Sequence, residues 1–161
     1  MARTEDSTRH GGPRDEPHGG PHGGPRGGHR SVPHTADLRV EAWAPTREEC
    51  LAHAVRGVCE SFVDLSGAVG RRRRDVEVRA ETDEDLLVAL LDEVVYRLDA
   101  DGEVPVEAES AAVPGGMRAV LHMADVGTLA ETGAAPKAVT LHGLSFGRGG
   151  HGWECSVTLD V

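Results

Sequence analysis

The spacing of apolar residues is the feature that most constrains the fold of this 161-residue chain. Residues 37–44 and 76–81 alternate apolar with polar side chains, as strands with one buried face do. Each is followed by an apolar stripe at helical spacing, and the second stripe covers a broad face over 86–98. The first stripe comprises Leu51, Val55, Val58, Phe62 and Leu65. Alternation then returns in three runs, over 104–108, 117–123 and 153–161. The pattern predicts two helices, several strands and one hydrophobic core.

Local signals place the ends of these elements. Thr46 and Glu49 fit a capping box, which satisfies free backbone amides at the start of a helix. Thr82 precedes three acidic residues that favour a second helix start. Glycine-rich turns over 114–116 and 147–152 separate consecutive strands and favour antiparallel hairpins over parallel crossovers. We therefore expect a single small α+β domain, with an antiparallel-rich sheet and two helices.

The first 30 residues contain no Val, Leu, Ile, Phe or Trp, and they repeat Pro-His-Gly-Gly tetrapeptides. Such a segment cannot bury enough apolar surface to offset the entropy lost on ordering. We expect a disordered tail over residues 1–31 and a folded domain over 32–161. A metal-binding role for the histidines of the tail is the alternative interpretation.

Charge and cysteine content exclude several classes of protein. Residues 31–161 hold 12 Lys and Arg against 23 Asp and Glu, so we expect little direct binding to nucleic acid. The basic run Arg71–Arg74 is interpreted as a solvated turn, with a phosphate-binding patch as the alternative. Cys50, Cys59 and Cys155 form no CxxC pair, which excludes a disulfide framework or zinc ribbon. The chain shows no signal peptide or membrane span, and we expect it in the cytoplasm.

Candidate site residues, namely the functional candidate His34 and the oxygen donors Asp37, Asp160 and Val161, lie at the two ends of the predicted domain. His34 and Asp37 lie where the chain enters its first predicted strand, and Asp160 and Val161 end the last one. A side-chain carboxylate beside the terminal carboxylate suits a hard cation such as Ca²⁺ or Mg²⁺. If the first and last strands are neighbours, Asp37 completes a three-residue cation site.

Two further residues are candidates for a functional role. Lys137 is the only lysine in a chain rich in arginine, so its ammonium group is interpreted as having a task that a guanidinium would not perform. The alternative is an ordinary exposed residue at a strand start. His142 follows on the same strand, with a hydrogen-bonded strand-end histidine as the alternative to a functional one. Standard nucleotide-binding and hydrolase motifs are absent, which does not support an autonomous enzyme.

Four segments together, in this order and spacing, resemble the archease family over residues 32–161. The segments are His34-Thr-Ala-Asp37, Leu86-Leu-Val-Ala-Leu-Leu-Asp-Glu-Val-Val-Tyr96, Lys137-Ala-Val-Thr-Leu-His142 and Val157-Thr-Leu-Asp-Val161. The resemblance implies a small α+β accessory protein that activates a GTP-dependent tRNA-splicing RNA ligase. It also implies Ca²⁺ binding by Asp37, Asp160 and Val161, and a functional role for Lys137. The chain departs from the family at Leu141, where an aromatic residue is usual, and over 125–136, which lacks the usual Gly-Glu-rich loop.

The function expected from this resemblance is that of a protein partner and not of an enzyme. The chain would promote guanylylation and multiple turnover of a ligase that joins 3′-phosphate to 5′-hydroxyl RNA ends. An acidic domain would approach a basic, RNA-binding ligase under favourable electrostatic steering. The rival hypothesis is a metal-dependent phosphoester hydrolase or transferase that uses Asp37, His34 and Asp160. A third is a structural protein with a metal-binding tail.

Overall fold

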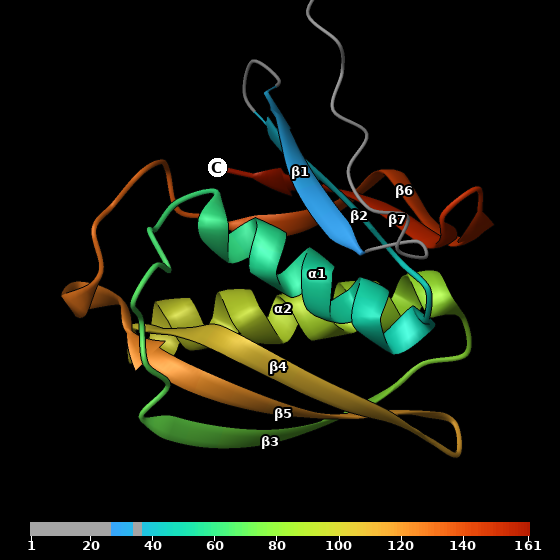
Figure 1. Ribbon diagram of the computed structural model, residues 1–161, viewed down its shortest axis with the longest axis horizontal. Helices are drawn as coiled ribbons and strands as arrows, with labels where there is room; N and C mark the ends of the chain where they lie inside the picture. Colours follow the sequence, from blue (N-terminus) through green and yellow to red (C-terminus); the bar gives the residue numbers. More distant parts are fainter. Residues whose placement is uncertain (1–26, 34–36) are drawn as a thin grey trace, which may run out of the picture.

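The computed structural model describes residues 27–33 and 37–161 as two helices between two antiparallel sheets (Figure 1). The first sheet has the strand order β1-β2-β7-β6, with β1 at Gly28–Pro33, β2 at Asp37–Ala44, β7 at Gly152–Asp160 and β6 at Ala138–Gly149. The second sheet has the order β3-β5-β4, with β3 at Arg72–Arg79, β5 at Gly116–Asp125 and β4 at Glu103–Val113. The helices are α1 at Arg47–Glu60 and α2 at Asp83–Asp101, and a short 3₁₀ turn covers Val126–Thr128. This confirms the α+β class and the two hairpins.

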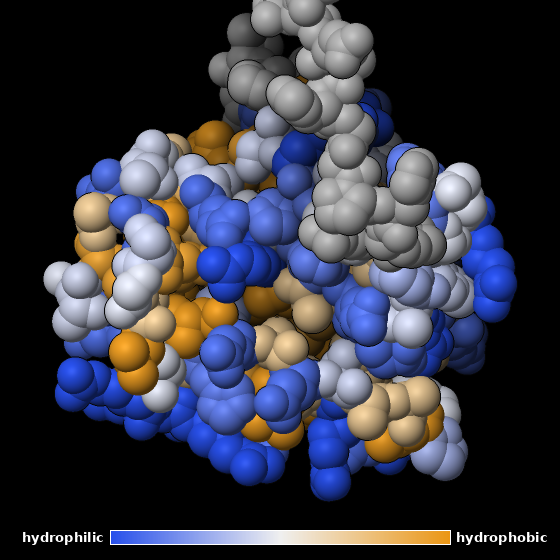
Figure 2. All heavy atoms as spheres, in the orientation of Figure 1, coloured by the Kyte–Doolittle hydropathy of each residue, from blue (hydrophilic) through white to orange (hydrophobic). Residues whose placement is uncertain are grey.

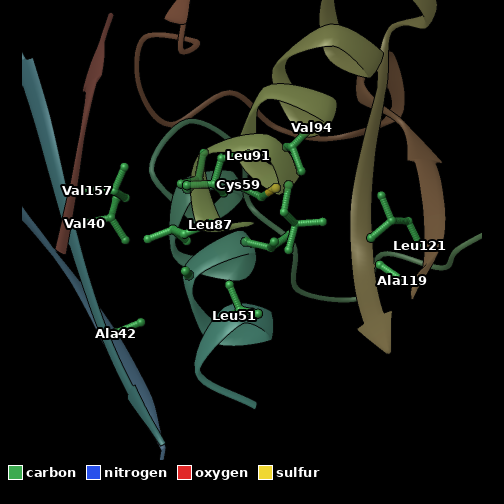
Figure 3. Close-up of a cluster of buried hydrophobic side chains, with 14 of the residues drawn as sticks. Val40, Ala42, Leu51, Cys59, Leu87, Leu91, Val94, Ala119, Leu121 and Val157 are labelled. Carbon is green, nitrogen blue, oxygen red and sulfur yellow. The ribbon is translucent and has the colours of Figure 1, made fainter. Parts of the chain in front are cut away.

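The core lies in the middle layer, because each helix is covered by a sheet on both sides. In Figure 3, Leu51, Leu87 and Leu91 on the helices lie between Val40 of the first sheet and Leu121 of the second, and all five are fully buried. In the view of Figure 2, hydrophobic residues show between polar ones over the middle of the molecule. Two-sided burial explains why the predicted stripe on the second helix is so broad.

Both predicted helix starts are confirmed in atomic detail. The Thr46 hydroxyl accepts from the Glu49 amide at 3.2 Å, and the Thr82 hydroxyl accepts from the Asp85 amide at 3.1 Å. Gly102 ends α2 with φ +64°, a left-handed conformation that favours glycine. Local capping chemistry therefore sets these boundaries as expected.

The first helix ends earlier than its apolar stripe predicts. It stops at Glu60, and Phe62 and Leu65 are buried beyond it. The Ser61 hydroxyl donates to the Val58 carbonyl at 2.6 Å and so competes with the helical pattern. The chain then pairs with residues 130–132, where the Thr132 amide donates to the Phe62 carbonyl at 2.9 Å. A long-range backbone pairing thus replaces the last helical turn.

The predicted tail boundary at residue 31 is wrong, because residues 28–31 belong to β1. This strand pairs along its whole length with β2, from Gly28 opposite Trp43 to Pro33 opposite Leu38. Its anchor is polar: His29 Nε2 lies 2.5 Å from a Glu60 carboxylate oxygen on α1. Backbone pairing, this contact and an ion pair from Arg30 to Glu41 on β2 hold a strand that has almost no apolar pattern. The rest of the predicted tail, residues 1–26, lies outside the described residues.

The basic run is not the solvated turn that the sequence predicted. Arg72, Arg73 and Arg74 lie in β3. Arg72 and Arg74 both bind the carboxylate of Glu103 on β4, at 2.8 and 3.0 Å. Glu103 is only 2% exposed, so the two guanidiniums compensate a nearly buried charge. The run therefore has a structural partner that lies far away in the sequence.

Candidate functional site

The candidate site lies at one end of the first sheet, where β2 begins and β7 ends. These two strands are antiparallel neighbours, and their register places Asp37 directly opposite Asp160. On the other side, Asp160 pairs with Ala138 of β6, and the Lys137 amide donates to the Asp160 carbonyl at 2.7 Å. Figure 1 shows this end of the sheet beside the marked C-terminus. Asp37 and Asp160 are thus in one row, and Lys137 lies one residue before Ala138 at the end of the same row.

Both aspartates belong to the outward face of the sheet. Val40, Ala42 and Ala44 of β2 are buried, and Asp37 has the opposite strand parity. Asp160 is exposed at the end of β7, next to Val161. Side chains directly opposite in an antiparallel pair have β-carbons about 5 Å apart, close enough for two carboxylates to share a cation. The register adds what parity could not show, namely that the two aspartates are direct neighbours across the β2–β7 pair.

The charges in this row lack compensating partners among the described residues. Within residues 27–33 and 37–161, no ion pair involves Asp37, Asp160 or Lys137. The same part of the chain holds no cluster of three or more His, Cys, Asp or Glu side chains suited to a metal ion. Asp37 and Asp160 lie opposite each other, and their use as ligands of a cation together with Val161 stays a prediction.

The two candidate histidines differ from the aspartates. His34 lies outside the described residues. His142 is exposed in β6, within an interruption of the pairing with β7 between Thr140 and Ser145. Its amide donates to the Thr140 hydroxyl at 3.3 Å, and Gly143 follows with φ +67°. The strand register does not bring His142 into the row of Asp37 and Asp160.

A hollow further along the same outward face was missed by the sequence analysis. Its volume is about 460 Å³, and its lining includes Arg30, Arg39, Trp43 and His151. The Trp43 and His151 rings lie 6.0 Å apart between centroids. Arg39 donates to the Ser156 hydroxyl at 2.9 Å, across the β2–β7 pair. Strand parity already put Arg39 and Trp43 on the polar side with Asp37, and this signal could have found the hollow.

The fold and the site together define a small three-layer domain, in which two helices lie between two antiparallel sheets and a pair of aspartates lies at the end of the first sheet. The fold is similar to the solution structure of protein 1598 from Methanobacterium thermoautotrophicum, with a TM-score of 0.66 and 24% identity over 83% of this chain and 99% of that one. It is also similar to the crystal structure of an archease, possible chaperone, from Thermotoga maritima, with a TM-score of 0.57 and 20% identity over 81% of this chain and 94% of that one. At these identities the likeness concerns the fold alone.

Sequence comparison identifies the family. Residues 29–161 match the archease protein family. The chain is 53% identical over 133 residues to a probable protein archease of Mycobacterium tuberculosis strain H37Rv, covering 83% of this chain and 74% of that one. It is 29% identical over 140 residues to the protein archease of Archaeoglobus fulgidus, covering 83% and 98%. The chain belongs to the archease family.

No helix in the described part of the chain is long and apolar enough to cross a membrane.

Proposed function

We propose that this protein activates a GTP-dependent RNA ligase of the tRNA-splicing type by promoting its guanylylation and multiple turnover. The observation that carries the proposal is that Asp37 lies directly opposite Asp160, while the Lys137 amide donates to the Asp160 carbonyl at 2.7 Å. These residues come from three of the four segments that carry the family resemblance. Lys137 and Asp160 are exposed and Asp37 is half-buried, so a partner protein can reach this end of the sheet.

A cation at this row would be held by Asp37, Asp160 and an oxygen of Val161. When bound, it would supply positive charge between two carboxylates that face each other across the strand pair. Lys137 is exposed, and its backbone amide is hydrogen-bonded to the Asp160 carbonyl. Its ammonium group can therefore bind an anionic group of the partner close to Asp160. The acidic domain would favour encounter with a basic ligase and would compete little for its RNA.

The decisive experiment measures the ligase with and without this protein. Two quantities are followed: the fraction of ligase that carries covalent GMP, and the number of joined RNA ends per ligase molecule. We expect both to rise with wild-type protein, and to fall at least tenfold toward the unstimulated level with Asp37→Asn or Lys137→Ala. Asp99→Asn is the matched control, because Asp99 is an exposed aspartate on α2. Unchanged guanylylation and turnover with wild-type protein would refute the proposal.

A ligase-free arm tests the rival hydrolase hypothesis in the same experiment. The protein alone, with Ca²⁺ or Mg²⁺, is incubated with phosphoester substrates, and we expect no turnover above background. Titration calorimetry of Ca²⁺ then tests the cation site, with an expected dissociation constant in the weak range near 10⁻³ M, about where sparse oxygen sites lie. Equal heats for wild type, Asp37→Ala and Asp160→Ala would contradict the cation site without touching the activator role.

A further inference from the structure

Two of the three cysteines meet in the core, although 105 residues separate them. Cys50 lies in the first turns of α1, and Cys155 lies in β7. Their sulfur atoms are 3.7 Å apart, and both residues are almost fully buried. Cys59 is also buried on α1, nine residues after Cys50, which corresponds to about 13 Å along the helix axis. The fold therefore pairs Cys50 with Cys155 and leaves Cys59 apart.

The contact between the two sulfur atoms is directional. The Cys50 thiol lies within hydrogen-bonding range of the Cys155 sulfur and of the Ala42 carbonyl, at 3.6 Å. Donation from Cys50 lowers the pKa of Cys155 and raises that of Cys50. Cys155 is thus the better nucleophile of the two, and Cys50 is positioned to react with it next. A disulfide has sulfur atoms about 2.05 Å apart, so less than about 2 Å of relative movement converts this contact into a bond.

We propose that Cys50 and Cys155 form an intramolecular disulfide when the protein meets a peroxide. The Cys155 thiolate attacks one oxygen of hydrogen peroxide, the O–O bond breaks, and hydroxide leaves to give a sulfenic acid. The Cys50 sulfur then attacks the Cys155 sulfur, the S–O bond breaks, and the departing hydroxide takes up the Cys50 proton as water. The proton that Cys155 lost on forming its thiolate converts the first hydroxide to water. Each sulfur loses one electron, and one peroxide is reduced to two waters.

The bond would join the helix layer to the first sheet. It would connect α1 to β7, the strand whose last residue is Asp160. Since it closes a loop of about 100 residues, it should restrict the unfolded chain strongly. We expect the oxidised protein to melt roughly 5–10 °C higher than the reduced protein. Because both cysteines are buried, we expect them to react with a small oxidant such as hydrogen peroxide more readily than with a bulky alkylating reagent.

The test treats the full chain with hydrogen peroxide and counts free thiols after denaturation. We expect the count to fall from three to one, the mass to fall by the two hydrogens of one disulfide, and digestion to release a Cys50–Cys155 peptide pair. Cys59→Ser is the matched control and should form the same bond, whereas Cys50→Ala should not. Melting curves of oxidised and reduced wild type complete the comparison.

Three results would overturn the proposal. They are retention of all three thiols, a gain of oxygen atoms in place of hydrogen loss, and a peptide map that links Cys59 or two separate chains. Because the peptide map is made on wild-type protein, a cysteine variant that fails to fold does not affect the outcome. The ligase assay is independent of this result, so each proposal can fail alone.

Discussion

The two sheets pack on the same helix layer, but the Glu103 cluster of the second sheet and the Asp37–Asp160 pair of the first differ in how their charges are compensated. In the second sheet, Arg72 and Arg74 of β3 bind the almost fully buried Glu103 of β4. In the first sheet, Asp37 and Asp160 face each other, and no ion pair within the described residues neutralises them. The Glu103 charge is thus compensated within the fold, whereas the two aspartates have no such compensation among the described residues. A charged residue is thus informative about function only once its partner is known.

The largest expected effect on stability comes from a substitution in the helix layer, on which both sheets pack. Leu87 is fully buried on α2 in the middle layer, so Leu87→Ala should lower the free energy of unfolding by about 3 kcal/mol. Trp43 and Trp153 both lie in the first sheet, so fluorescence follows that sheet, while circular dichroism follows the whole fold. Urea curves from the two probes should shift together.

Leu141 provides the control for this prediction, because it is 71% exposed. Leu141→Ala should change stability by less than about 0.5 kcal/mol. If Leu87→Ala shifted only the fluorescence curve, the sheets would not share one cooperative core.

A smaller loss of stability is expected when the ion pairs of Glu103 in the second sheet are broken. Glu103→Gln removes the carboxylate that binds two guanidiniums, and should cost roughly 2 kcal/mol, as lost hydrogen bonds to charged groups do. Ligase stimulation should stay at the wild-type level, because the change lies in the sheet opposite the candidate site. Glu107→Gln on the same strand is exposed and should leave the urea midpoint unchanged. A loss of stimulation at full folding would contradict the separation of roles.

The pH dependence of stability sharpens the same comparison. The hydrogen bond from Arg74, aided by Arg72, lowers the pKa of Glu103 below its ordinary value of 4.5. On acidification, Glu103 therefore takes up a proton in the unfolded chain before it does so in the folded chain. The stabilisation from its charge is complete above the ordinary pKa and is lost as pH falls through the folded pKa. The stability difference between wild type and Glu103→Gln should therefore shrink between about pH 5 and pH 3. A constant difference across this range would mean that the carboxylate charge contributes nothing.

The smallest expected effect on stability comes from the candidate site. Asp37→Asn removes one of two like charges directly opposite each other, so stability should stay within about 0.5 kcal/mol of wild type or rise slightly. The same variant should lose ligase stimulation. Thermal melts and the ligase assay on one preparation would show whether the first sheet separates function from stability. A melting temperature that falls as far as that of Glu103→Gln would show that Asp37 is structural.

The sequence by itself determined the features that depend on near neighbours. The alternation over 37–44 predicted β2 with its correct bounds, and Thr46 and Thr82 predicted both helix starts. These succeed because capping and strand parity involve residues a few positions apart. Parity also put Asp37 and Asp160 on the outward face, although it could not show that their strands are neighbours.

Only the tertiary structure decided what depends on partners far away in the chain. It placed Asp37 opposite Asp160 and paired two arginines of the basic run with Glu103. It also added β1 to the first sheet through backbone pairing with β2. It also brought Cys50 to Cys155, where sequence spacing had excluded a disulfide framework. Local periodicity shows which face a side chain occupies, but strand order and register show what it meets. Those depend on how the whole core packs, which no short window of sequence contains.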